Sequence, residues 1–503
     1  MGSTLGINDL FLRLWHEVDI TKNKKWFFCH KGGSYRKWYG NIDFVVDWEN
    51  DGRRVKDEGK ATIRGEANAF KEGICWTQLT TGLPSFRVKE EGTFIESASG
   101  MCRIDSSLKY YLMGYLNSIV VSFILDALNP TLHIQTGDIS RLPWIIDTAE
   151  IAEVSERVQE AISICKAEWD SWEHSYEFSS HPLISGDNKI EEAYRKWKVC
   201  CESWFERIKI IEETNNEYFI RLYGLEDVLN KTVMDSDISI RKSNLHKDIC
   251  SLVSYAVGCM FGRYSLDVEG LAYAGGDWKE AYATKYKTFM PDADAIIPIT
   301  DEEYFKDDIV ARFVDFIRIV YGEETLEENL KFIADALGNK GDTPRAVIRN
   351  YFLNDFYKDH CNTYSVTGSG KRPIYWLFDS GKQNGFKALI YIHRYTPDTV
   401  GLIRSVYLHN AQAAIQNSLQ NSEYIISTTT SATERARETR KKDKYVKQLN
   451  ELRPYYQALS HIALQRIPMD LDDGVKKNYQ LFQGVEVSTE GKKKQTIDLL
   501  AKI

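Results

Sequence analysis

The hydrophobic pattern changes its period along this chain, and that change restricts the folds available to it. In residues 10–104, short β-branched or aromatic runs such as 44–46 and 94–95 alternate with turns such as 50–52. After residue 108 the apolar positions mostly recur every three or four residues, which is typical of amphipathic helices. With 503 residues, 43% of them apolar, the chain can form more than one core. We therefore predict an α+β protein in which a β-rich N-terminal part precedes a mostly helical region.

Several segments give specific helical predictions. Residues 108–128 form an apolar stripe at helical spacing, and the Asn-Pro pair that follows ends it. Thr325 and Glu328 have the spacing of a capping box, which marks the start of another helix. Residues 402–426 and 432–467 predict a long helical hairpin. Apolar residues in its second arm are spaced by four and three, as in the seam of a coiled coil.

These patterns divide the chain into five predicted units. They are a mixed α/β unit at 1–145, a helical brace at 146–235, a helical domain at 236–400 with a β-hairpin near 374–392, a coiled-coil-like helical hairpin at 401–468 and a C-terminal tail at 469–503.

A cationic and aromatic segment at residues 20–42 stands out from an otherwise acidic chain. It has six Lys or Arg residues and no Asp or Glu, although the formal charge of the whole chain is -8. Cations of this kind neutralise phosphates, and aromatic faces stack on bases. The residues predicted to contact nucleic acid are Lys22, Lys24, Lys25, Lys31, Arg36, Lys37, Trp38 and Tyr39. The alternative is a purely structural hairpin on a small β core, because basic runs are often solvated faces.

Residues 76–87 are the segment best suited to reading bases. Short polar side chains can form hydrogen bonds to base edges, and an arginine can pair with guanine or bind a phosphate. The predicted reading residues are Gln78, Thr80, Thr81, Ser85 and Arg87. The alternative is an ordinary polar loop over a β core. A second basic patch, on the predicted hairpin near 374–392, suggests weaker phosphate contacts.

Long segments in order along the chain carry a resemblance to a known family. They are KGGSYRKWYGNIDFVVDWENDG (31–52), WTQLTTGLPSFRV (76–88), YLMGYLNSIVVSFILDALNPTLHIQTGDISRLP (111–143), LVSYAVGCMFGRYSLDVEGLAYAGG (252–276) and RPIYWLFDSGKQNGFKALIYIHRY (372–395), followed by the closing LLAKI. In these segments the chain resembles the specificity region of BREX-type adenine-specific DNA methyltransferases, the PglX family.

The resemblance implies a target-recognition half that lacks its catalytic domain. Members of the family carry a methyltransferase domain with a glycine-rich cofactor loop and an Asn-Pro-Pro-Tyr type motif. This chain has no Pro-Pro pair, and Thr131 follows its single Asn-Pro. The expected partners are double-stranded DNA, a methyltransferase catalytic domain or subunit, and other BREX proteins. S-adenosylmethionine is expected as the cofactor of the complete enzyme, with no catalytic or cofactor-binding residue in this chain.

Other chemistry finds little support in the sequence. The nine cysteines form no CxxC pair, and the Cys-His neighbours at 29–30 and 360–361 have no partners at ligand spacing, so we predict reduced thiols and no metal site. The TGSGK segment at 367–371 lacks the first glycine and the final hydroxyl of a phosphate-binding loop.

The expected location is the cytoplasm. The first residues lack the apolar run of a signal peptide, and no stretch approaches the roughly 18 apolar residues of a membrane span. Two other functions remain open at this stage: a protein-interaction scaffold of a defence complex without its own DNA readout, and an enzyme with an unrecognised active site.

Overall fold

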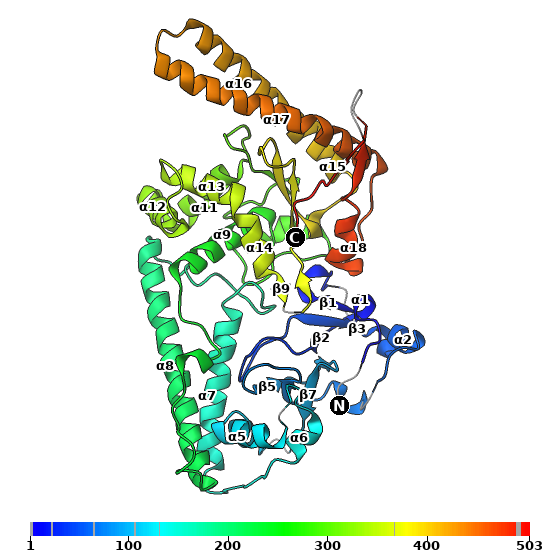
Figure 1. The fold of residues 1–503 in the computed structure, drawn as a ribbon, viewed down its shortest axis with the longest axis vertical. Helices are drawn as coiled ribbons and strands as arrows, with labels where there is room; N and C mark the ends of the chain where they lie inside the picture. The colour runs from blue at the N-terminus through cyan, green and yellow to red at the C-terminus, as the bar shows by residue number, and fades with distance from the viewer. Residues whose placement is uncertain are drawn as a thin grey trace.

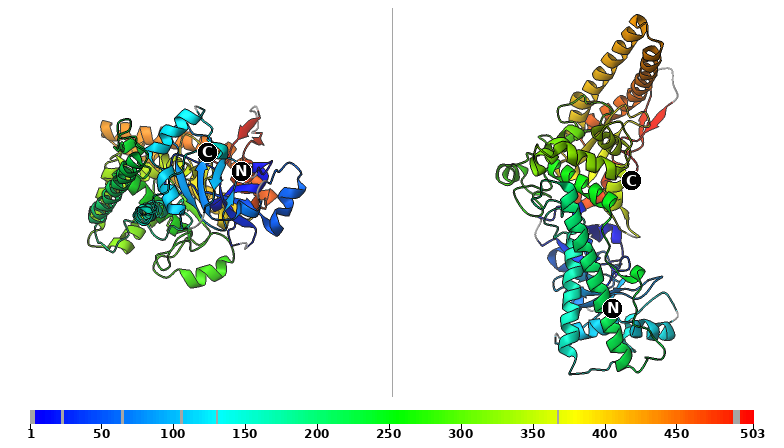
Figure 2. Two further views of the ribbon diagram at one scale, coloured as in Figure 1. Left: turned by 90° about the horizontal axis from the view of Figure 1, so that it is seen from below. Right: turned by 90° about the vertical axis from the view of Figure 1, so that its left-hand side faces the viewer.

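Two groups of strands lie beside a pair of long helices, and a helical hairpin projects from the opposite end of the molecule (Figure 1). The computed structural model describes residues 4–21, 24–63, 66–104, 107–129, 131–366, 368–488 and 494–503. The predicted α+β class is confirmed: helices dominate, and the strands form small separate sheets. Figure 2 shows that the hairpin and the long helices give the molecule an extended outline.

The N-terminal part contains two small sheets. One has the order β1-β3-β2-β6, in which β2 and β6 are parallel, and the other is antiparallel with the order β5-β4-β7. The strands are β1 (Leu12–Leu14), β2 (Trp26–His30), β3 (Phe44–Asp47), β4 (Gly73–Thr77), β5 (Phe86–Lys89), β6 (Phe94–Ile95) and β7 (Ser99–Cys102). Short helices join them: α1 (Asn8–Phe11), η1 (Trp15–Glu17), α2 (Glu49–Asp57) and α3 (Glu66–Ala69). The predicted turn at 50–52 is present at the start of α2, where all three residues have positive φ.

The single helix predicted at 108–128 is wrong, because the chain bends there. The structure has α4 (Lys109–Leu116) and α5 (Ile119–Leu128), which meet at 66°. The Asn117 side chain, at the bend, accepts a hydrogen bond from the Phe86 amide and donates one to the Phe86 carbonyl, both at 3.0 Å. These two bonds tie the bend to the start of β5. No single described helix is long and apolar enough to cross a membrane; α4 and α5 reach that length and composition only as a bent pair.

Two long antiparallel helices, here called the brace, lie within the segment 146–235. They are α7 (Ile151–Asp170) and α8 (Ile190–Leu222), and the short α6 (Thr136–Ser140) precedes them. Val154, Val158 and Phe219 are fully buried where α4 packs against both long helices. The brace therefore shares a core with the second sheet of the N-terminal part.

The segment at 245–363 is mostly helical, as the apolar spacing after residue 108 predicts. Its helices are α9 (Leu245–Phe261), α10 (Trp278–Lys285), α11 (Ile309–Tyr321), α12 (Leu326–Leu337), α13 (Pro344–Asn354) and α14 (Phe356–Thr363), with η2 (Asp235–Asp237) before them. The capping box predicted for α12 is not formed. Thr325 instead donates its hydroxyl to the Asn188 carbonyl at 2.7 Å, so the hydroxyl fixes a tertiary contact and does not cap the helix.

The predicted β-hairpin is present and gains a third strand. β11 (Tyr375–Asp379) pairs antiparallel with β12 (Lys387–Tyr391), and β8 (Ile296–Pro298) pairs with the other edge of β12. The short strands β9 (Ser365–Val366) and β10 (Gly370–Lys371) precede β11, and η3 (Ile392–Arg394) follows β12. This sheet lies at the centre of the largest hydrophobic core.

The C-terminal part contains the projecting hairpin and then returns to the sheet. α15 (Thr399–Leu402) and the π-helical η4 (Ile403–Leu408) lead into α16 (His409–Thr428) and α17 (Ala432–Gln465), followed by η5 (Leu471–Asp473), α18 (Gly474–Gln480), β13 (Val485–Val487) and β14 (Gln495–Ile497). The described residues of the segment predicted as a tail, 469–503, thus contain a helix and a pair of antiparallel strands. The amide of Ala501 donates to the Leu377 carbonyl at 2.8 Å, which ties these residues to β11.

Candidate nucleic-acid interface

Residues 31–41, here called the inner segment, run between the second sheet and the brace. The amide of Trp38 donates to the Phe86 carbonyl and the amide of Val88 donates to the Trp38 carbonyl, both at 2.9 Å, so the inner segment continues the edge of β5. Trp38 adopts φ of 70°, and its side chain is only 1% exposed. The segment is therefore part of the interior at this point.

Glu212 of α8 binds two neighbouring residues of the inner segment. Its carboxylate accepts hydrogen bonds from Lys37 Nζ at 2.7 Å and from the Trp38 indole N–H at 2.9 Å. Burial works against the charged form of Lys37, but the carboxylate of Glu212 outweighs it and holds the pKa of Lys37 above its usual value. Lys37 is thus a buried, paired cation.

Glu168 of α7 plays the same part for Arg36. The Arg36 guanidinium binds Glu168 Oε2 at 2.5 Å and lies over the ring of Trp169, 4.7 Å from its centroid. Gly40 adopts φ of 120°, and a Cβ there would lie 2.4 Å from Arg36 Nε, so only glycine leaves room for the arginine. Arg36 therefore fastens the inner segment to the brace.

The expectation that Arg36, Lys37, Trp38 and Tyr39 form a DNA-facing surface is corrected by these contacts. Lys37 is 7% exposed and Tyr39 is 4% exposed, so neither can reach a phosphate or stack on a base without leaving its partners. The reason is the supply of carboxylates on α7 and α8, residues far away in sequence that neutralise the local positive charge. These four residues therefore have the structural role that the alternative prediction gave to the segment.

Two residues of the predicted reading segment are also interior. Arg87 has no exposed surface; it donates to the Arg36 carbonyl at 3.1 Å and to the Thr77 hydroxyl at 3.2 Å. Ser85 is buried beside it. Burial lowers the pKa of Arg87, which has no acidic partner among its hydrogen bonds to described residues. The expected contacts of Ser85 and Arg87 with DNA are therefore also corrected.

The rest of that segment lies at the surface, where two loops pair. Residues 78–82 and 131–133, here called the paired tip, are joined by a hydrogen bond from the Thr80 amide to the Leu132 carbonyl at 3.0 Å. A second bond, at 2.8 Å, runs from the Ile134 amide to the Gln78 carbonyl. Gln78 and Thr80 are half-buried and Thr81 is exposed, whereas Leu79 and Leu132 expose 66% and 55% of their surface. The paired tip thus presents polar and apolar side chains on a fixed backbone.

The lysines at the start of the cationic segment have different surroundings. Lys24 is exposed, whereas Lys25 binds Asp472 at 2.6 Å. Lys31 is half-buried, with its Nζ 4.9 Å from the centroid of the Phe44 ring. Lys22 lies outside the described residues. Lys31 lines a pocket.

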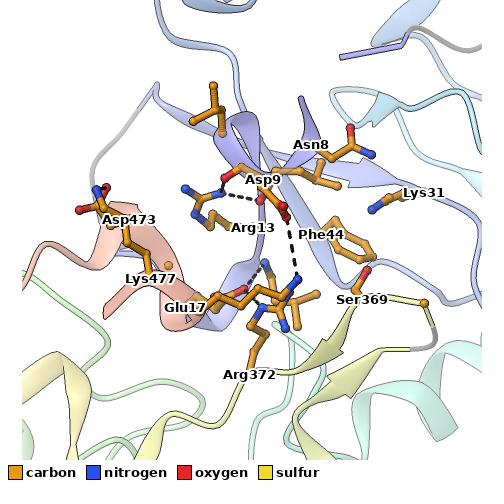
Figure 3. A pocket seen from close by; sticks show the side chains of 16 residues that line it. Asn8, Asp9, Arg13, Glu17, Lys31, Phe44, Ser369, Arg372, Asp473 and Lys477 are labelled. Atoms are coloured by element: carbon orange, nitrogen blue, oxygen red, sulfur yellow. Dashed lines mark hydrogen bonds and ion pairs between the residues drawn. The ribbon is translucent and has the colours of Figure 1, made fainter. Parts of the chain in front are cut away.

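This charged pocket lies where the N-terminal sheet meets β10 and α18, and its volume is about 420 Å³ (Figure 3). It is lined by five cations and three acids, a formal excess of two positive charges: Arg13, Lys31, Arg372, Lys476 and Lys477 with Asp9, Glu17 and Asp473. Glu17 is buried and accepts hydrogen bonds from the amides of Leu14 at 3.0 Å and Val475 at 2.7 Å, which joins the two ends of the chain. The pocket has the charge and depth to take an anionic group.

The TGSGK segment contributes to this pocket without forming a phosphate-binding loop. Gly368 and Ser369 line the pocket, but β10 follows them, not a helix N-terminus that could cradle phosphates. The second basic patch is divided between interior and surface. Lys387 is 8% exposed and donates to the Leu353 carbonyl at 2.8 Å, and Arg372 is 9% exposed, whereas Lys371 is half-buried and Lys382 is exposed. Of that patch, Arg372 alone lines the charged pocket.

Sequence reasoning missed two components of this surface. The 131–133 loop carries no Lys, Arg, Asp or Glu, and its place beside residues 78–80 is recognised only from their pairing. Arg13, Lys476 and Lys477 come from opposite ends of the chain, so no local pattern could group them with Lys31. A tertiary contact creates both features.

Comparison with known proteins shows what this chain is similar to. No protein-family model matches it. Over nearly all of its length, however, the chain is a homologue of adenine-specific methyltransferases.

Two of these relatives are curated proteins. The adenine-specific methyltransferase PglX of Lacticaseibacillus casei (strain Zhang) is 39% identical over 519 residues, which covers 96% of this chain and 42% of the relative. The adenine-specific methyltransferase BrxX of Escherichia coli O9:H4 (strain HS) is 35% identical over 514 residues, which covers 95% of this chain and 42% of the relative. The chain is thus related to the PglX and BrxX methyltransferases and spans less than half of their length.

Proposed function

We propose that this chain is the DNA-specificity portion of a BREX-type N6-adenine DNA methyltransferase that acts in phage defence. The observation that carries the proposal is the similarity to two adenine-specific methyltransferases over about 96% of this chain but 42% of each of them. The part of those relatives that this chain does not cover has room for a complete methyltransferase domain. Methyl transfer from S-adenosylmethionine would then be performed by residues outside this chain.

The paired tip is the proposed base-reading element. Base edges in the major groove are read by hydrogen-bonding side chains, and the thymine methyl group is read by apolar contact. Gln78 and Thr80 supply the first kind of group, and Leu79 supplies the second. The backbone hydrogen bonds between the two loops favour such a role, because they fix the direction of the side chains before DNA binds.

The charged pocket is the proposed contact for the DNA backbone. Phosphate contacts position a protein on the duplex without reading its sequence. The pocket combines Lys31 and Arg372 with two lysines of α18, and its excess of positive charge contrasts with the acidic chain as a whole. We infer that Lys31 keeps the phosphate-binding role expected from the sequence.

The division of labour is tested by assaying the pure chain with labelled S-adenosylmethionine and unmethylated DNA. No transfer is expected from this chain alone, and transfer is expected to appear when the remaining portion of a PglX relative is added. Transfer by the pure chain would contradict the proposal.

Specificity is tested by selecting binding sequences from a random duplex library with the full chain. Enrichment of a short common site is expected. If all sequences are recovered equally at low salt, the chain contacts only the DNA backbone and does not read bases. The paired tip would then be removed from the proposal.

The competing proposal is a protein-interaction scaffold. The projecting hairpin favours it, since Tyr424 of α16 exposes 67% of its surface and Val446 of α17 exposes 39%. A stable complex with other BREX proteins, combined with no shift of duplex DNA in a gel, would favour the scaffold over the specificity portion.

A further inference from the structure

Helices α9 and α14 bring together three side chains with metal-ligand chemistry. His246 and Cys250 lie four residues apart on α9 and therefore share one face of the helix. Asp359 lies on α14, and the ligand atoms of the three residues all fall within 4.8 Å of one another. His246 is exposed and the other two are half-buried, so an ion can enter from solvent.

The separation of the nitrogen and sulfur atoms matches a tetrahedral zinc site. Zinc binds sulfur at about 2.3 Å and nitrogen at about 2.0–2.1 Å, so at the tetrahedral angle the two ligand atoms lie about 3.6 Å apart. His246 Nε2 lies 3.7 Å from Cys250 Sγ. The same two atoms would otherwise share a weak thiol–imidazole hydrogen bond, and the experiments below separate the two cases.

The histidine is held in the tautomer that binds a metal. His246 Nδ1 lies 2.9 Å from the Ala336 carbonyl, and a carbonyl can only accept, so Nδ1 carries the proton. In the neutral ring Nε2 then has a free lone pair directed towards Cys250. Metal-binding histidines are commonly oriented in this way by a hydrogen bond at the other nitrogen.

The carboxylate is oriented as well. The Tyr351 hydroxyl donates to Asp359 Oδ2 at 3.0 Å, and Tyr351 comes from a third helix, α13. Ligand carboxylates are typically held by such outer hydrogen bonds. Both the ring and the carboxylate are thus positioned by groups that do not themselves bind an ion.

The three residues line one cavity of about 520 Å³, which leaves space beside them for a fourth ligand. Trp172 lines the same cavity, and its buried indole N–H has no hydrogen-bond partner among the described residues. Three protein ligands with one open position are typical of zinc sites that bind water or an anion.

We propose that His246, Cys250 and Asp359 form a zinc site that fastens α14 to α9 and binds water or a small anion at its fourth position. Binding removes the proton of the Cys250 thiol to solvent and forms one bond each to sulfur, nitrogen and oxygen. The expectation of no metal site rested on the lack of a CxxC pair and on Cys-His neighbours without partners at ligand spacing. The local pattern that points to the site is the His-x-x-x-Cys spacing within α9.

The first test uses cobalt as a spectroscopic probe on the full chain stripped with a chelator. One equivalent of Co²⁺ is expected to produce a thiolate-to-cobalt charge-transfer band and intense visible bands of four-coordinate cobalt, both of which disappear when Zn²⁺ is added. Cys250→Ser should abolish the charge-transfer band, whereas Cys200→Ser, at a half-buried thiol of α8 outside the cluster, should leave it unchanged. Absence of the band in the unaltered chain, or its persistence in Cys250→Ser, would overturn the proposal.

The second test needs no substitution in the ligands and so does not depend on their folding. Cys102, Cys200 and Cys250 are the half-buried thiols, and alkylation followed by mass spectrometry reports on each of them. Zn²⁺ is expected to protect Cys250 and to leave the other two as reactive as before. Equal reactivity of Cys250 with and without Zn²⁺ would contradict the site.

The third test separates orientation from ligation. Tyr351→Phe removes the hydroxyl that holds Asp359 and is expected to weaken Zn²⁺ binding about 10-fold, in the range found for removal of orienting groups. Asp359→Asn should weaken it more. Unchanged zinc affinity in both variants, with native circular dichroism, would remove Asp359 and α14 from the site.

Discussion

In both the inner segment and the paired tip, the exposure of the side chains is the opposite of what the composition suggests. The inner segment has the cations and aromatic rings of a nucleic-acid surface, yet Lys37 and Trp38 are buried against Glu212. The paired tip has no Lys or Arg, yet Leu79 and Leu132 are among the most exposed apolar residues. Local charge therefore does not place a segment at the surface; the position of its counter-charges does.

The largest expected effect comes from removing one such counter-charge. Glu212→Gln leaves Lys37 buried without a carboxylate, and breaking a buried ion pair from one side costs about 3–5 kcal/mol of unfolding free energy. Urea unfolding of the two proteins measures the change. Glu217→Gln on the same helix is the matched control, because its pair with Lys231 is exposed and its removal should leave the unfolding free energy nearly unchanged. Equal effects of the two substitutions would show that the inner segment is not held by its ion pair.

Glu173 is a second buried carboxyl, but among the described residues it is bound by a hydroxyl group and by no cation, so its effect on stability depends on pH. Burial raises the pKa of Glu173 to about 7 from 4.5, against a hydrogen bond from Ser254. Between these values the folded chain holds a proton that the unfolded chain has released, so this group lowers stability as the pH rises through the window. The full cost, present above about pH 7, is on the order of 3 kcal/mol.

Glu173→Gln should remove this contribution and make unfolding free energy less dependent on pH between 4.5 and 7. Thermal unfolding across the window provides the measurement, and Glu156→Gln at an exposed position of α7 is the control. The same pH slope in the unaltered chain and in Glu173→Gln would show that the carboxyl is not kept protonated by burial.

An intermediate effect is expected at the paired tip. Gln78→Ala should reduce discrimination at one base of the selected site, by about 1–3 kcal/mol, while the dependence of binding on salt stays the same. Competition between matched and altered duplexes measures the reduction. Gln420→Ala, on the surface of α16, should change nothing. If Gln78→Ala instead changes the salt dependence of binding and keeps the discrimination between bases, the paired tip contacts the DNA backbone.

The smallest effect is expected at the charged pocket. Lys31→Gln should weaken binding to all sequences alike, by about 1 kcal/mol, and reduce the slope of log K against log salt by about 0.9, because one phosphate is no longer neutralised. Binding titrations at several salt concentrations give the slope. Lys331→Gln, exposed on α12, serves as the control. A changed sequence preference in Lys31→Gln would place this lysine at a base.

Features set by local rules could be predicted from the sequence. Thr343 caps α13 as its spacing with proline indicates, accepting a hydrogen bond from the Ala346 amide at 3.2 Å. Gly338 ends α12 with φ of 103°. The hairpin of α16 and α17 and the pairing of β11 with β12 also followed from periodicity and turn residues.

Features set by distant partners could not be predicted. The bend between α4 and α5 depends on Asn117 reaching Phe86 and on Asn216 accepting from the Ile119 amide at 2.9 Å. Thr325 does not cap α12, because its hydroxyl donates to the Asn188 carbonyl. In the candidate interface, Gln78 and Thr80 lie near the surface as expected, whereas Ser85 and Arg87 follow the chain into the interior at β5.

The bend at Asn117 has a mechanical consequence. Asn117 grips β5, the strand that follows residues 78–82 of the paired tip, and Asn216 ties the start of α5 to α8. A displacement of the tip by an incoming duplex would therefore pull on a 33-residue helix, a lever about 50 Å long. The other end of α8 contacts α12, so a movement at the paired tip would be transmitted along this helix to the helical domain.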